Sequence, residues 1–295
     1  MQSADFLSAV FFYLKVGGNL NQNWIVENLN NAFSTWNGKL GELWGLVTTG
    51  PQTFKGGAVW GVMQTLHNGM VGIGYALVVL FFAISLCKNT MNFHELKRPE
   101  AAIHYFLRFV AAKALVGYGM DIMLNVFSIC NGIVTDMADS MGGISEAMVS
   151  LPAEMQTAIE NVGFLASIPL WLVTILGSLF ITVLSFVMIL TVYGRFFRLY
   201  MYTALAPLPL AAFAGESTQS VGISFLKSYV GVCLEGAVIV LACVIYSAFV
   251  STPTVTSGEA TTIVWNFLAE TVFNMLVLVG LIKGSDRIIH EMMGL

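Results

Sequence analysis

The chain has 295 residues, of which 57% are hydrophobic and only 10% are charged, whereas ordinary soluble domains carry a charge on about a quarter of their residues. This composition excludes an ordinary soluble domain and predicts an integral membrane protein. The net charge of -4, from 13 basic and 17 acidic residues, excludes a general electrostatic attraction for nucleic acid.

Residues 1–57 have an amphipathic pattern, and no run within them is long and apolar enough to cross a bilayer. Apolar residues recur at helical spacing on either side of Gly17 and Gly18, so the pattern predicts two amphipathic helices with a break between them. We expect residues 1–57 to form an external region, followed by a transmembrane helical domain over residues 58–295. The second apolar stripe consists of Ile25, Leu29, Phe33, Trp36, Leu40, Leu43 and Val47.

Five apolar runs in the second region are long enough to span a membrane, and they predict an all-α fold. Basic residues gather at alternate ends of these runs, while residues 131–163 and 251–262 contain no Lys or Arg. Because cytoplasmic loops are enriched in Lys and Arg, this bias predicts an external N-terminus and a cytoplasmic C-terminus. The expected spans are residues 58–86, 101–130, 164–193, 228–250 and 263–282.

Between the third and fourth spans, residues 199–214 form an apolar segment that contains Pro207 and Pro209. Two prolines remove two backbone donors and disfavour a straight helix, and Arg195 and Arg198 just before them mark a cytoplasmic edge. The segment is either a broken, re-entrant piece covered by protein or a proline-kinked helix in the membrane interface. The sequence does not decide between the two.

Five charged residues fall inside the expected spans: Arg108, Lys113, Asp121, Glu235 and Glu270. Intramembrane charges are expensive, so they usually pair with one another or line water. Arg108 and Glu235 lie at matched depths on different helices, which suggests that they pair. Ion pairs between helices or subunits are one interpretation of the five charges, and a hydrated pathway or proton relay is the other.

The sequence shows no arrangement typical of an enzyme or a metal site. His94, His104 and His290 lack metal-ligand spacing, and His67, among small residues, is typical of a hydrogen-bonded packing residue. The chain contains no GxxxxGK[ST] phosphate loop and no GxSxG nucleophile motif. We therefore expect no catalytic residues, no cofactor and no bound metal.

One stretch carries a family resemblance. An arginine-bearing helix end, then LAPLPLAAF, then the linker ESTQSVGIS and another apolar helix resemble the TrbL-type family over about residues 162–282. Members are polytopic membrane subunits of conjugative type IV secretion systems, so the resemblance implies a channel or scaffold subunit in the bacterial cytoplasmic membrane.

The resemblance also implies partners for the chain. They are secretion and coupling ATPases, external stalk or wall-spanning components, further copies of the chain, membrane lipids and, transiently, the translocated DNA–protein substrate. From the residues alone, a small-solute transporter or ion channel is the alternative. That alternative would predict paired broken helices in both halves of the chain, whereas only the second half carries a proline break.

Overall fold

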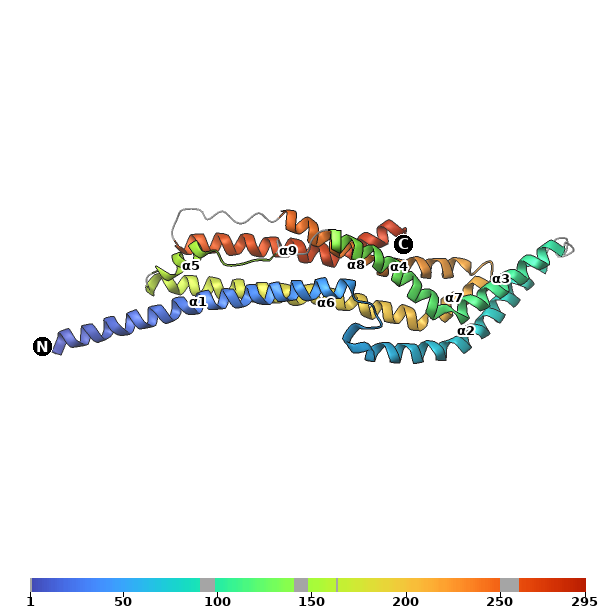
Figure 1. The fold of residues 1–295 in the computed structure, drawn as a ribbon, viewed down its shortest axis with the longest axis horizontal. Coiled ribbons are helices and arrows are strands. Elements are labelled where there is room, and N and C mark those ends of the chain that lie inside the picture. The colour runs from blue at the N-terminus through green and yellow to red at the C-terminus, as the bar shows by residue number, and fades with distance from the viewer. Residues whose placement is uncertain (1, 91–98, 141–147, 163, 250–259) are drawn as a thin grey trace. The chain divides into compact units, whose positions relative to one another are not determined.

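The computed structural model describes residues 2–90, 99–140, 148–162, 164–249 and 260–295, and every regular element within these ranges is helical (Figure 1). The predicted all-α fold is therefore confirmed for the described chain. The elements in order are α1 (Gln2–Thr48), η1 (Phe54–Gly57), α2 (Ala58–Thr90), α3 (Pro99–Gly117), α4 (Gly119–Ser140), α5 (Ala153–Glu160), α6 (Phe164–Leu205), α7 (Pro207–Ala211), η3 (Ala212–Ala214), α8 (Gln219–Phe249) and α9 (Ala260–Met293).

Four of these helices, α2, α6, α8 and α9, are long and apolar enough to cross a membrane. Helices α3 and α4 form a fifth candidate span if they are counted together. This pair is bent by 73° at Tyr118. The prediction of several membrane-spanning helices is confirmed, but residues 101–130 do not form one straight helix as expected. Glycines at positions 117 and 119 flank the bend, and glycine permits such a change of direction.

The N-terminal region differs from its prediction, because α1 is one continuous helix of 47 residues that runs through Gly17 and Gly18. A glycine inside a helix costs only about 1 kcal/mol relative to alanine, and the apolar pattern continues on both sides. The predicted apolar stripe from Ile25 to Val47 is buried throughout. The predicted buried face is therefore confirmed, and the predicted break between two helices is wrong.

The third long helix also extends beyond its predicted end. Helix α6 does not stop near residue 193 but continues to Leu205, so Arg195 and Arg198 lie inside it. Gly194 is tolerated within the helix, and the next residue that prevents a regular helix is Pro207, which has no backbone N–H. The helix thus ends just before the two prolines, as predicted. Its end lies about two turns after Arg198.

The described chain divides into two compact units. Unit 1 comprises Met1–Gly45, Met141–Thr191 and Leu241–Lys283. Within it, Phe33 of α1 packs edge-to-face on Phe267 of α9 at 6.2 Å between ring centroids. Asn28 of α1 donates a hydrogen bond to Ser178 of α6. These contacts bury the apolar stripe of α1 against α6 and α9.

Unit 2 comprises Leu46–Ser140, Val192–Val240 and Gly284–Leu295. Helices α2 and α3 lie side by side, and α7 and η3 pack against both of them (Figure 1). Phe54 of η1 stacks on Phe196 of α6 with 4.0 Å between ring centroids, and Tyr200 donates a hydrogen bond to the carbonyl oxygen of Pro51. Unit 2 holds most of the charged residues that the sequence singled out.

Candidate functional site

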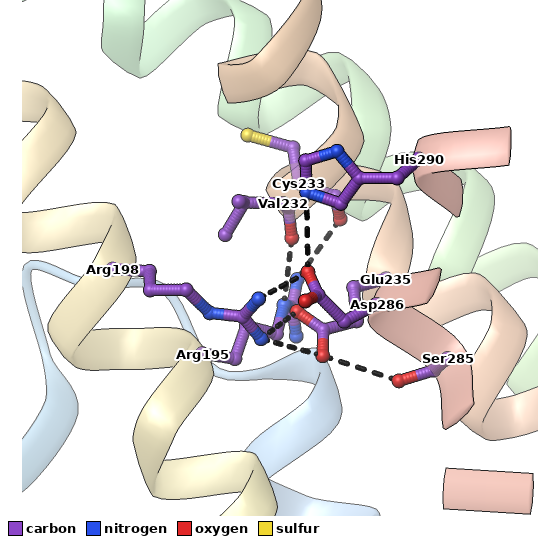
Figure 2. A network of polar contacts seen from close by, with 8 residues as sticks. All are labelled: Arg195, Arg198, Val232, Cys233, Glu235, Ser285, Asp286 and His290. Atoms are coloured by element: carbon purple, nitrogen blue, oxygen red, sulfur yellow. Dashed lines mark hydrogen bonds and ion pairs between the residues drawn. The ribbon is translucent and has the colours of Figure 1, made fainter. Parts of the chain in front are cut away.

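A partly buried charge cluster in unit 2 joins α6, α8 and the last turns of α9 (Figure 2). Helix α6 supplies Arg195 and Arg198, which share one face because they are three residues apart. Helix α8 supplies Glu235, and α9 supplies the polar side chains at positions 285, 286 and 290, which are Ser285, Asp286 and His290.

Arg198 binds two carboxylates at once. Its Nη2 donates to both carboxylate oxygens of Glu235, at 2.8 and 2.7 Å, and its Nη1 donates to Asp286. Glu235 is 1% exposed and also accepts a hydrogen bond of 3.1 Å from Ser285. Nε2 of His290 lies 3.5 Å from Oδ1 of Asp286. A carboxylate buried to this extent is stable only when it is paired and hydrogen-bonded, and Glu235 is both.

Arg195 is fully buried, and its guanidinium donates to three main-chain oxygens. The acceptors are Val232 at 3.2 Å and Cys233 at 3.0 Å on α8, and Val47 at 3.3 Å. Val47 lies in the last turn of α1, where carbonyl groups lack partners within the helix and a cation is favoured by the helix dipole. Arg195 therefore ties the end of α1 to α8.

Gly236 makes room for this guanidinium. A Cβ atom at position 236 would lie 2.8 Å from Nη1 and 2.9 Å from Cζ of Arg195, which is closer than van der Waals contact permits. Glycine at this position lets a buried arginine lie directly against α8. No pattern in the sequence indicates this role, because Gly236 stands in an otherwise ordinary apolar helix.

A second feature explains how the chain accommodates its proline break. The carbonyl oxygen of Thr203 would bind the N–H of residue 207 in a regular helix, but Pro207 has none. His67 of α2 is 2% exposed, and its Nδ1 lies 2.7 Å from that oxygen. Since a carbonyl can only accept, Nδ1 carries the proton and donates. His67 is thus a hydrogen-bonded packing residue, as predicted.

The proline segment is covered by protein on the side of α2 and α3. A Cβ atom at Gly74 would lie 2.9 Å from both the Pro207 oxygen and Cγ1 of Val116. A Cβ atom at Gly119, beside the α3–α4 bend, would lie 3.2 Å from Leu210. The bend between α3 and α4 therefore lies against the proline segment. Irregular backbone at membrane depth needs such cover, and the cover is compatible with both predicted interpretations of residues 199–214.

The other charges of the expected spans do not join the cluster. Arg108 donates to Gln219 at 2.9 Å, so the predicted pairing of Arg108 with Glu235 is wrong. Two residues at the same depth in a membrane need not meet, because depth determines neither which helices are neighbours nor which of their faces are in contact. Lys113 and Glu270 are exposed, and Asp121 lies in the lining of a polar cleft.

Sequence reasoning missed the contribution of α9 to the cluster. The apolar pattern predicts a cytoplasmic tail after residue 282, whereas α9 continues to Met293. The spacing of Asp286 and His290 by four residues was a usable signal, because it places both on one helix face.

The one side-chain hydroxyl of the cluster, Ser285, donates to Glu235, whose carboxylate is already paired with Arg198. Among the described residues no three His, Cys, Asp or Glu are grouped to hold a metal ion. His94 lies outside the described residues. The contacts of the cluster pair charges between α6, α8 and α9.

Comparison with known protein families gives a match over more than half of the chain. Residues 36–207 match the protein family described as TrbL/VirB6 plasmid conjugal transfer like protein. No curated protein and no solved structure matches the chain. The matched range is more than half of the 295 residues, and it contains His67, Arg195, Arg198 and Pro207. The chain therefore belongs to the TrbL/VirB6 family and is a multi-pass membrane component of a conjugal transfer system.

Proposed function

We propose that the chain is a channel or scaffold subunit of a conjugative type IV secretion machine, located in the bacterial cytoplasmic membrane. The observation that carries this proposal is the family match over residues 36–207. That range includes the end of α1, the whole of α2 to α6 and the first proline of the break. The proposal accordingly rests on the same segment that builds most of unit 2.

The buried part of the charge cluster supports a scaffold role within one copy of the chain. Arg195 and Glu235 are buried, and both are hydrogen-bonded to neighbouring helices. The cluster fixes α6, α8 and α9 against the end of α1, and a rigid membrane unit of this kind suits a subunit on which others assemble.

The proposed orientation places the N-terminus outside and the C-terminus in the cytoplasm, because residues 131–163 and 251–262 lack Lys and Arg. The C-terminal end of α9 would then face the secretion ATPases and the coupling protein. The N-terminal part would face the external stalk or wall-spanning components, and further copies of the chain would complete a homo-oligomer. We propose no catalytic role for this subunit.

A small-solute transporter or ion channel remains the second candidate, because one argument against it no longer holds. The first half of the chain also contains a broken helix, at Tyr118 between α3 and α4, and discontinuous helices line the ion sites of many transporters. Purified protein in liposomes distinguishes the two functions. Ion flux that the protein alone supports would favour the second candidate over a scaffold.

The test of the leading proposal replaces both prolines of the break, Pro207→Ala with Pro209→Ala. Pro207 stands at the start of α7, a position that proline tolerates well, so we expect only a small gain in helix stability from the replacement. The variant should reach a normal level in the membrane, while conjugative transfer falls by orders of magnitude because the surface built by the break is lost.

The matched control is Pro169→Ala, which makes the same chemical change inside α6 but away from the break. It should leave transfer unchanged. Mating frequency and membrane abundance are measured in the same cells. Normal transfer by an abundant double variant would show that the break has no role in the machine.

A further inference from the structure

Helix α1 in unit 1 has one buried apolar face and one open polar face, which takes no part in the charge cluster or in the proline break. A Cβ atom added at Gly38, Gly41 or Gly45 would have no atom within 4 Å, so the open face is uncovered there. The exposed residues of this face include Glu27, Asn30, Asn31, Ser34, Gly38 and Gly41.

Beside this face, α6 carries a band of exposed apolar side chains that runs from Ile168 to Leu190. The helical rise makes the band about 33 Å long, which is close to the thickness of about 30 Å of a membrane's hydrocarbon core. Helix α6 is also one of the helices that are long and apolar enough to cross a membrane. The band therefore indicates where unit 1 faces lipid.

Helix α1 runs parallel to α6 along this band. Trp24 packs on Trp171 with 5.7 Å between ring centroids, and Nζ of Lys39 lies 6.0 Å from the ring centroid of Phe186. The hydrogen bond that Asn28 donates to α6 lies between these two contacts. The open polar face of α1 is therefore at the depth of the lipid-facing band, where charged and amide groups would be costly against lipid.

A piece of irregular backbone lies at the same depth. Asn37 of α1 holds Val149 by two hydrogen bonds, from its Nδ2 to the carbonyl oxygen at 2.8 Å and from the backbone N–H to its Oδ1 at 3.0 Å. Residues 148–152 are not helical, and Met148 and Ser150 are exposed. Non-helical backbone at membrane depth occurs only where protein buries it or where it lines a water-filled cavity, so this exposure indicates water beside α1.

Two grooves flank the open face and offer space for that water. One, of about 350 Å³, lies between α1 and α6 and is lined in part by Asn31, Thr35 and Thr182. The other, of about 490 Å³, lies between α1 and residues 148–150 and is lined in part by Ser34. One water occupies about 30 Å³, so each groove has room for several waters next to amide and hydroxyl groups.

We propose that residues 24–45 of α1 cross the membrane beside α6, and that the open polar face of α1 lines a water-filled path for the hydrated substrate of the transfer machine. This role rests on the proposed function as a channel subunit, and it places these residues inside the membrane instead of in the expected external region. Counting apolar runs misses such a crossing, because only one face of the helix is apolar. One helix cannot enclose a path, so further copies of the chain complete its wall.

The test measures how fast single cysteines react with a small, charged, membrane-impermeant methanethiosulfonate. The full-length protein is kept in the assembled machine without its four native cysteines, and the cells are opened so that the reagent reaches both sides. Asn31→Cys and Ser34→Cys should react about tenfold or more faster than Phe180→Cys and Val183→Cys, because the reactive thiolate is disfavoured in apolar surroundings. Phe180 and Val183 are matched controls, since both are exposed in the lipid-facing band at a similar depth.

A leucine variant tests whether the path carries the substrate. Asn31→Leu with Ser34→Leu should reach a normal level in the membrane but lose conjugative transfer, since an apolar lining expels water from a narrow path. Phe180→Leu with Val183→Leu is the control and should keep transfer.

Equal reaction rates at the four cysteines would overturn the proposal, because the two faces would then share one environment. Normal transfer by an abundant Asn31→Leu, Ser34→Leu variant would also overturn it. A failure of the proposed function looks different. If the chain had no part in the machine, the proline variant and the leucine variant would both transfer normally, whereas a dry α1 face would leave the proline variant defective and the four cysteines equally slow.

Discussion

The carbonyl oxygen of Thr203 binds His67 because Pro207 cannot bind it. The hydrogen bond from Nδ1 of His67 measures 2.7 Å and replaces the helical bond that proline removes. A histidine on α2 therefore compensates for a proline that follows α6, although 136 residues separate His67 from Thr203. This relationship explains how the buried Thr203 carbonyl oxygen keeps a hydrogen-bond donor near the end of the helix.

The first prediction follows from this compensation. His67→Leu should destabilise the protein by about 1–3 kcal/mol, because the buried Thr203 oxygen loses its donor. In a Pro207→Ala background the same change should cost less, since alanine restores a backbone N–H at position 207 that can bind that oxygen. Thermal unfolding of the four proteins of this double-mutant cycle measures the coupling, which we expect to be about 1 kcal/mol.

His67→Gln is the control for this cycle, because glutamine keeps a side-chain N–H donor. It should destabilise less than His67→Leu. Additive effects of His67→Leu and Pro207→Ala would contradict the compensation.

The second prediction concerns Glu235, which has Arg198 as its ionic partner. Glu235→Gln should destabilise the protein by about 1.5–3 kcal/mol, because the buried side chain loses its charge-assisted hydrogen bonds to Arg198, while Arg198 keeps Asp286 as a partner. Arg287→Gln breaks an exposed pair with Glu291 and should cost at most about 0.5 kcal/mol. Both effects are read from thermal unfolding of purified protein, and equal effects would contradict the burial of the cluster.

A charge swap tests whether Asp286 takes part in the pairing of Arg198 with Glu235. Exchanging the two residues, Arg198→Glu with Glu235→Arg, would place a new carboxylate beside Asp286, which Arg198 binds. The swap should therefore restore only a small part of the lost stability. Full restoration in the same unfolding measurement would show that Asp286 does not matter to the pair.

The third prediction concerns the space for Arg195. Gly236→Ala should destabilise the protein, because its Cβ atom would lie 2.8 Å from a buried guanidinium that three carbonyls hold in place. Gly132→Ala on α4 has no atom within 4 Å of the new Cβ. It should be neutral or stabilise by about 0.5–1 kcal/mol, the usual gain of alanine over glycine in a helix. A stabilising Gly236→Ala would show that the guanidinium moves freely.

The fourth prediction tests the proposed orientation by cysteine labelling in a background without the four native cysteines. A membrane-impermeant maleimide should modify Ser150→Cys in whole cells and Met292→Cys only after the cells are opened. Both sites are exposed. Ser285 would be a poor probe, because its side chain is buried and donates to Glu235. External labelling at Met292→Cys would reverse the orientation.

The sequence by itself determined the class of the protein and the existence of most helices. Apolar runs long enough to cross a bilayer form helices, because a helix pairs all of its backbone N–H and C=O groups within the run. The stripe from Ile25 to Val47 follows helical spacing closely enough to identify its buried face. Pro207 also indicated the end of a helix, because the missing N–H is a local property of the residue. These features depend on neighbours along the chain alone.

Only the tertiary structure decided which polar groups meet. Arg108 and Glu235 lie at matched depths, but the rotation of each helix about its axis and the choice of neighbouring helices place Glu235 against Arg198 and Ser285. Asp286 enters the cluster because α9 continues past its apolar run. Such contacts join residues far apart in sequence, and their energies depend on packing and burial, which no local pattern in the chain encodes.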